Sequence, residues 1–178
     1  MLFRSFKIVI IFRVLRLDSA FDIEKKIFRN PDLRKKESMN DAIFSLPSPQ
    51  NEPVFPYAPG DKTRSEVEKQ IKTFRSETTD IPLIIGGKEI RTGNTVKAIE
   101  PHAHGRCLAN VHQAGEKETL MAVEAAMKAK REWENLAWHD RAAVFLKAAD
   151  LLAGKYRPIL NASTMLNQSK TIHQAEID

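Results

Sequence analysis

The sequence has little cysteine, and this limits the chemistry open to it. Cys107 is the single thiol among 178 residues, so no internal disulfide can form. No Cys-x-x-Cys pair exists to hold a structural zinc ion, and a reducing compartment such as the cytosol or the mitochondrial matrix is expected. The length fits one domain, or one domain with a tail.

Long apolar runs are also missing from the first residues, where a targeting or membrane segment would be expected. The run 8–12 has only five apolar residues before Arg13 interrupts it. A secretory signal needs an apolar run of about 7–15 residues, and a membrane span needs about 20. We therefore expect neither a secretory signal nor a membrane span.

Acidic residues are absent before Asp18, whereas basic residues are concentrated near the amino terminus. Residues 1–47 hold 10 Lys and Arg against 6 Asp and Glu, and residues 48–178 hold 18 against 17. The first segment is predicted to be a basic, poorly ordered leader, either a mitochondrial transit peptide of weak amphipathicity or a plain extension. The nearly neutral remainder disfavours nucleic acid as a partner, because phosphate binding needs basic side chains on a folded surface.

Nucleotide-binding and metal-binding motifs are missing as well. No Gly-x-Gly-x-x-Gly occurs, and the stretch 86–88 lacks the first glycine and the final Ser or Thr of a phosphate loop. Three histidines, His102, His104 and His112, lie near Cys107, but strand alternation sends Cys107 and His112 to opposite faces. A half-buried strand cysteine beside loop histidines is the simpler interpretation.

The remaining candidate side chains fit structural roles better than chemical ones. Glu132 and Glu134 lie on an exposed helical face, where solvation is the expected role. Trp133 and Trp138 are expected to anchor a core or its rim. The residues by themselves therefore indicate no catalytic, cofactor-binding or metal-binding site.

The pattern of the body predicts a mixed α and β domain. Five prolines between Pro47 and Pro59 predict an extended segment that packs against the surface of the later residues, and a helix is expected over 61–77. A hairpin is expected over 83–91 about the turn 86–87, and a second strand pair over 95–101 and 106–112.

The last third of the chain is predicted to be helical. A helix is expected over 116–133, with an apolar stripe that includes Leu120 and Val123. A second covers 144–152 and stops at Gly154, a third begins at Pro158, and a fourth begins with a capping box of Thr171 and Gln174. Because the fourth helix begins only a few residues before Asp178, truncation is expected.

Several stretches carry a family resemblance. The segments 98–106 and 118–126 resemble the amino-terminal region of the aldehyde dehydrogenase superfamily. The segments 51–54, 145–152 and 163–178, the last reading STMLNQSKTIHQAEID, are similar to the delta-1-pyrroline-5-carboxylate dehydrogenase family within it. The resemblance covers residues 50–178 and departs from the family at Asn167, where the family has glycine and a side chain is expected to disturb the following turn.

The resemblance implies a partial aldehyde dehydrogenase fold of the α/β class, with residues 48–178 flanking an NAD-binding domain. It also implies oxidation of L-glutamate gamma-semialdehyde, a small-molecule substrate, to L-glutamate with NAD in proline catabolism. A mitochondrial matrix location and a homo-oligomer are implied in the same way. The family's catalytic cysteine, general base and cofactor contacts match nothing before Asp178, so no site residue is transferred.

The sequence leaves two interpretations open. In the first, the chain is a fragment of such an enzyme, inactive and loosely folded alone, because its helices bury their stripes against a sheet and against absent segments. In the second, it is a non-catalytic helical interaction module that associates with full-length subunits.

Overall fold

The computed structural model describes residues 48 and 50–178, so the predicted leader over 1–47 lies outside the described residues. Three strands form one sheet in the order β1-β5-β4. They are β1 (Thr79–Ile81), β4 (Thr95–Ile99) and β5 (Cys107–His112). The central strand β5 runs parallel to β1 and antiparallel to β4, which confirms the second predicted strand pair.

A separate hairpin follows β1. It joins β2 (Leu83–Ile85) to β3 (Lys88–Ile90), with Ile84 opposite Glu89 in the register. Gly86 and Gly87 form the turn with φ angles of 56° and 77°, a backbone region that glycine adopts without a steric penalty. The predicted glycine turn is therefore confirmed.

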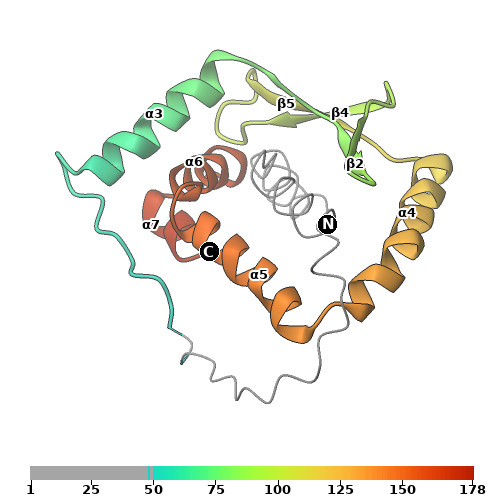
Figure 1. Cartoon of the computed structure of the whole chain (residues 1–178). Helices are drawn as coiled ribbons and strands as arrows, with labels where there is room; N and C mark the ends of the chain where they lie inside the picture. Colours follow the sequence, from blue (N-terminus) through green and yellow to red (C-terminus); the bar gives the residue numbers. More distant parts are fainter. Residues whose placement is uncertain (1–47, 49) are drawn as a thin grey trace.

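The core lies where two helices cover the sheet (Figure 1). Helix α3 (Lys62–Ser76), which confirms the helix expected over 61–77, packs against α6 (Arg157–Gln168), and Val67 is its buried residue. Buried residues of the strands and of α6 form one apolar cluster, which consists of Ile81, Leu108, Ala109 and Leu166. A second cluster joins the extended segment to both helices through Tyr57, Val67 and Ala162. The proline-rich segment thus packs on the body, as the sequence predicts.

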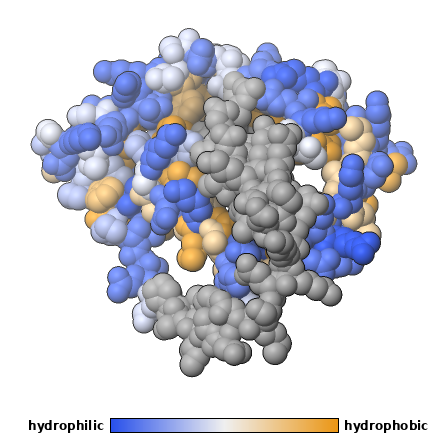
Figure 2. Space-filling model, viewed as in Figure 1, coloured by the Kyte–Doolittle hydropathy of each residue, from blue (hydrophilic) through white to orange (hydrophobic). Residues whose placement is uncertain are grey.

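Two long helices form an arm between the sheet and α6 (Figure 1). Helix α4 (Glu116–Asn135) leads away from β5, and α5 (Trp138–Ala153) returns toward α6 and the short α7 (Ile172–Glu176). Neither α4 nor α5 contains a fully buried residue. Apolar colour is visible over α4 at the right-hand margin of Figure 2. Leu120 and Val123 of the predicted α4 stripe are 61% and 55% exposed, so the described residues leave them largely uncovered, and the expectation that the stripe packs in part against absent segments stays a prediction.

Two local features differ from the sequence-based expectation, and one agrees with it. Strand β1 was not predicted, although Thr79 and Ile81 are β-branched. Asn167 lies inside α6, and the left-handed residue of the turn is Ser169 (φ 54°), so a side chain at Asn167 does not disturb that turn. Gly154 ends α5 as expected, with φ −108°.

Within residues 48 and 50–178, every helix is too short or too polar to cross a bilayer.

Candidate functional site

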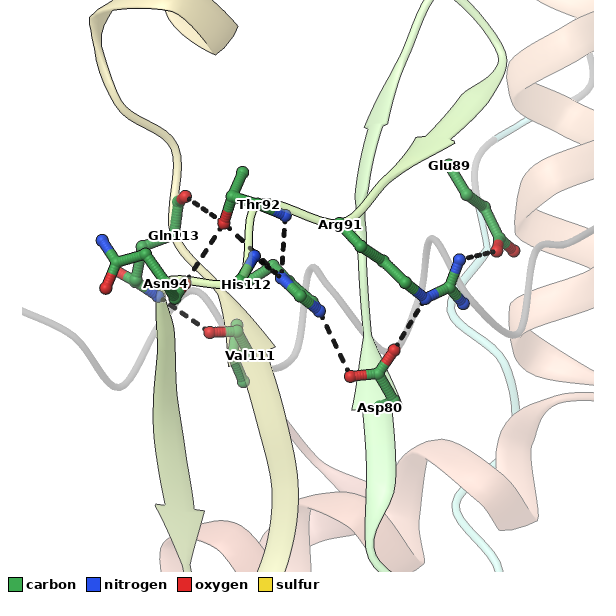
Figure 3. A network of polar contacts seen from close by, with 9 residues as sticks. Asp80, Glu89, Arg91, Thr92, Asn94, Val111, His112 and Gln113 are labelled. Carbon is green, nitrogen blue, oxygen red and sulfur yellow. Dashed lines mark hydrogen bonds and ion pairs between the residues drawn. The ribbon is translucent and has the colours of Figure 1, made fainter.

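A buried histidine joins the loop after the hairpin to the sheet (Figure 3). His112 lies at the end of β5, and its Nδ1 accepts hydrogen bonds from the backbone N–H groups of Thr92 (3.0 Å) and Gly93 (3.2 Å). Because Nδ1 accepts, the proton of the neutral ring must be on Nε2, which lies 3.3 Å from Oδ1 of Asp80. His112 therefore clamps the loop to β1 and β5.

Asp80 links this clamp to the hairpin. Arg91 donates from Nε to Oδ2 of Asp80 at 2.9 Å, and its Nη1 lies 3.0 Å from Oε2 of Glu89 (Figure 3). The hydrogen bond from Arg91, helped by the nearby His112, holds the pKa of Asp80 below its ordinary value. An Asp–His pair can orient a general base, but Nδ1 of His112 is already occupied by two backbone donors.

A second network surrounds Glu100, whose side chain is completely buried at the end of β4. Arg75 and Arg106 donate to its two carboxylate oxygens, and Nε2 of His102 lies 2.6 Å from Oε1. Nδ1 of His102 lies 2.8 Å from Oγ of Ser169, so the ring connects the β4–β5 turn to the α6–α7 turn. Burial opposes ionisation of Glu100, but the hydrogen bonds from both arginines outweigh it and lower the pKa of this carboxyl.

A third network fixes the extended segment to the last two helices. The fully buried carboxylate of Glu176 accepts from the backbone N–H of Phe55 at 2.9 Å, from the Tyr57 hydroxyl at 2.6 Å and from Asn161 at 2.7 Å. Arg157 forms a two-point pair with the same carboxylate and places its guanidinium 4.1 Å from the centre of the Phe55 ring.

The Glu176 network also determines the charge states of its members. Burial opposes ionisation of Glu176, yet its hydrogen bonds, first of all those from Arg157, hold its pKa below the ordinary value. Burial together with the Glu176 carboxylate raises the pKa of Tyr57 to about 12. The network therefore contains an anion, a cation and a neutral phenol at neutral pH.

The structure separates the residues that the sequence had grouped. His102 belongs to the Glu100 network, His112 to the hairpin clamp, and the exposed His104 to the turn between β4 and β5. Sγ of Cys107 lies 3.4 Å from the carbonyl oxygen of Ala109. Across the part of the chain that the structure describes, no group of three or more His, Cys, Asp or Glu side chains is placed to hold a metal ion.

The other candidates also keep structural surroundings. Glu132 and Glu134 are exposed on α4, and the Gly86–Gly87 turn serves the hairpin. Trp133 and Trp138 are 37% and 47% exposed, so they lie at a rim rather than in the core. Sequence reasoning overlooked Glu176 and Arg157, since Glu176 meets Phe55 and Tyr57 across about 120 residues of chain and no local pattern marks such a pair.

All three networks act as clamps that hold separate parts of the fold together. Each carboxylate is held ionised by at least one arginine, so it is a poor proton donor at neutral pH. Each network also joins segments that are distant in sequence, which fixes strand ends, turns and the extended segment in place. The geometry supports a framework that positions other groups.

Comparison with known proteins agrees with this architecture. The family model described as "Aldehyde dehydrogenase family" matches residues 89–178. The chain is 47% identical over 137 residues to the mitochondrial delta-1-pyrroline-5-carboxylate dehydrogenase of Dictyostelium discoideum, covering 77% of this chain and 25% of that protein. It is 44% identical over 138 residues to the delta-1-pyrroline-5-carboxylate dehydrogenase of Agaricus bisporus, with the same two coverages.

Solved structures give the same result. The delta-pyrroline-5-carboxylate dehydrogenase of Mycobacterium tuberculosis, known both alone and with bound NAD, is 43% identical with a TM-score of 0.75. The superposition covers 78% of this chain and 26% of that chain. The chain thus spans about a quarter of the length of the relatives that it matches.

These matches confirm the predicted α/β class and the partial aldehyde dehydrogenase fold. The family model includes β4 and β5, all of α4 to α7, the buried Glu100 and the Arg157–Glu176 pair. The chain belongs to the aldehyde dehydrogenase family.

Proposed function

We propose that this chain provides amino-terminal framework to an NAD-dependent dehydrogenase that oxidises L-glutamate gamma-semialdehyde to L-glutamate in proline catabolism. The observation that carries the proposal is the 47% identity over 137 residues to a delta-1-pyrroline-5-carboxylate dehydrogenase. The 0.75 TM-score against a second such enzyme supports it independently, because that value compares backbone positions.

The proposal extends to location and domain organisation. Residues 48–178 form part of the family's NAD-binding domain, and residues 1–47 act as a leader to the mitochondrial matrix. The basic composition of the leader and the mitochondrial name of the Dictyostelium relative support this. A fluorescent fusion of residues 1–47 is expected to enter mitochondria; a diffuse cytosolic signal would contradict the assignment.

NAD supplies the hydride acceptor in this reaction, so the fit of its phosphates to the described residues matters. Helix α4 follows β5 directly, and such strand-to-helix junctions hold phosphates in many folds. Here the first turn carries Glu116 and Glu118, and Oε2 of Glu118 accepts from the backbone N–H of Gly115 at 2.9 Å. The two carboxylates in the first turn disfavour a phosphate there, so this junction does not fit NAD.

The residues of this chain therefore act by positioning. The Glu176 network fixes the extended segment on α6, the Glu100 network fixes two turns, and the His112 clamp fixes the hairpin. Cys107 and Glu176 are each engaged within the fold, which leaves neither as an activated nucleophile or base. Proton and hydride transfer are assigned to the part of the enzyme that relatives carry outside the matched segment.

The test is a chimaera with the Dictyostelium enzyme. Residues 48–178 replace the matched segment of that enzyme, and NADH formation is measured with pyrroline-5-carboxylate. The chimaera is expected to keep activity within about tenfold of the parent, since the framework carries no reacting group. A folded chimaera that binds NAD but does not form NADH would overturn the proposed role.

The 178-residue chain assayed by itself is the negative control for the chimaera. We expect it to form no NADH with pyrroline-5-carboxylate and NAD, because the chain spans only about a quarter of the length of the relatives that it matches. Turnover at the rate of the Dictyostelium enzyme would contradict this expectation.

A further inference from the structure

A serine, a histidine and a buried glutamate form a chain of contacts between two turns of the fold. Oγ of Ser169, in the turn between α6 and α7, lies 2.8 Å from Nδ1 of His102. Nε2 of the same ring lies 2.6 Å from Oε1 of Glu100. A hydroxyl, an imidazole and a carboxylate in this order, each within hydrogen-bond distance of the next, are the groups that activate a serine nucleophile.

The charge of Glu100 decides where the ring proton of His102 lies. Burial opposes ionisation of Glu100, but Arg75 and Arg106 keep its pKa below the ordinary value, so its oxygens only accept hydrogen bonds at neutral pH. The proton of the neutral ring must then be on Nε2, because the other tautomer would place two acceptors 2.6 Å apart. Nδ1 keeps its lone pair, and the hydroxyl of Ser169 donates to it.

The serine and the histidine are open to solvent, whereas their support is not. Ser169 is exposed and the side chain of His102 is 45% exposed, while the side chain of Glu100 has no exposed area. An imidazole held at one nitrogen by a buried, ionised carboxylate keeps its orientation, as a catalytic base requires. A small substrate can therefore approach Oγ of Ser169 without disturbing the buried part of the network.

The backbone of Ser169 is in a conformation that favours glycine. Among the residues that the structure describes, only Tyr57 and Ser169 combine a side chain with a positive φ, and Ser169 has φ 54° and ψ 35°. This left-handed conformation is costly for a residue with a Cβ atom, and such residues are concentrated at functional sites. Because glycine would form the same turn at no steric cost, the turn alone does not explain the serine hydroxyl.

Positive charge lies close to the serine and the histidine. Nη2 of Arg75 is 3.4 Å from Nε2 of His102, and Nη1 of Arg106 donates to Oε2 of Glu100 at 3.2 Å. Two guanidinium groups against one carboxylate leave a net positive charge beside Ser169. Such a charge stabilises the oxyanion that forms when a hydroxyl attacks an ester carbonyl.

We propose that Ser169 and His102 are a catalytic pair, positioned by Glu100, that hydrolyses small carboxylic esters without NAD. Oγ of Ser169 attacks the carbonyl carbon while its proton passes to Nδ1 of His102. The intermediate expels the alcohol, which takes this proton, and the acyl group stays on Ser169. Water attacks the acyl-serine by the same route, releases the acid and restores the hydroxyl. This activity goes beyond the proposed dehydrogenase and needs no nucleotide.

The test is the hydrolysis of p-nitrophenyl acetate by the full 178-residue chain with no nucleotide present. Ser169→Gly removes the nucleophile and should leave the fold intact, since glycine accepts the left-handed conformation. His102→Gln keeps an amide that can donate to Glu100 but cannot take the proton of Ser169. Each variant is expected to lower the rate at least about tenfold.

Two matched variants control for unspecific effects of substitution. Ser65→Ala changes another exposed serine, on α3, and His104→Gln changes another exposed histidine, in the turn that contains His102. Both are expected to hydrolyse the ester at the rate of the parent chain. A loss in either control equal to the loss in Ser169→Gly would overturn the proposal.

Peptide mass spectrometry of the parent chain locates the acyl group and does not depend on how any variant folds. Acetyl on Ser169, absent when His102→Gln is treated in the same way, is the expected result, and a purely structural role for the two residues would not produce it. Acetyl found only on lysines such as Lys170, or equal rates for the parent and Ser169→Gly, would overturn the proposal. Far-UV circular dichroism checks that each variant keeps its helices.

Discussion

At the scale of single residues, the fold depends on carboxylates whose charge is neutralised inside the protein. Glu100 and Glu176 have no exposed side-chain area, and burying an unpaired carboxylate costs several kcal/mol. Arginine partners make that burial tolerable, and backbone and hydroxyl donors complete the shell around Glu176. Removing either charge should therefore cost more than the contact itself contributes.

Glu176→Gln tests this cost. The amide keeps the shape but leaves the guanidinium of Arg157, a residue only 8% exposed, without a counter-charge. We expect the free energy of unfolding to fall by about 3–5 kcal/mol. Urea denaturation measures it, with Glu134→Gln on the exposed side of α4 as control, expected to change stability by less than about 0.5 kcal/mol. Equal effects of the two variants would refute the clamp.

Acid should destabilise the protein through the same two groups. The pKa values of Glu100 and Glu176 are lower in the folded state than their ordinary value of 4.5. Their contribution to the free energy of unfolding is therefore complete above that value and is lost as the pH falls through the lowered folded pKa. Denaturation midpoints measured from pH 6 downward should decline, and the decline should be shallower in Glu176→Gln. Parallel curves would contradict the linkage.

At the scale of elements, neighbouring residues predict where most helices and hairpins begin and end, whereas pairing between residues far apart in the chain cannot be predicted from the sequence. The Gly86–Gly87 turn and the Thr171–Gln174 capping box were predicted because their geometry depends on neighbouring residues. Strand β1 was not predicted, because its three residues become a strand only by pairing with β5 about 30 positions later. Glu176 escaped notice for the same reason, since its partners converge only in the folded chain.

The predicted end of α5 at Gly154 is confirmed. The residue has φ −108°, and a Cβ there would lie 2.9 Å from the carbonyl oxygen of Asp150. We expect Gly154→Ala to lower stability by about 1–3 kcal/mol, because the backbone must shift to relieve the contact. Gly105→Ala is the control, as no atom lies within 4 Å of a Cβ there. Thermal melts of both variants decide the point.

At the scale of the whole molecule, the buried core lies in one region and the exposed apolar side chains of the α4–α5 arm lie in another. Buried residues lie in the sheet, in α3, in α6 and α7 and in the extended segment, whereas the α4–α5 arm has none. The folded part should therefore be held by the sheet side, and the arm should contribute mainly apolar surface. We therefore expect the sheet side to be ordered by its core and the arm to promote association through its exposed apolar side chains.

The last prediction uses that division. Leu120→Lys combined with Met127→Lys places two charges on the apolar stripe of α4, where the native side chains are 61% and 62% exposed. Because these side chains bury little, we expect the free energy of unfolding to change by less than about 0.5 kcal/mol. Light scattering at rising protein concentration should fall well below that of the parent, since the apolar patch is interrupted. Val67→Lys is the opposite control: the native side chain is 4% exposed in the core, so a lysine there should unfold the protein and increase scattering. Unchanged scattering in the double variant would mean that association begins elsewhere on the molecule.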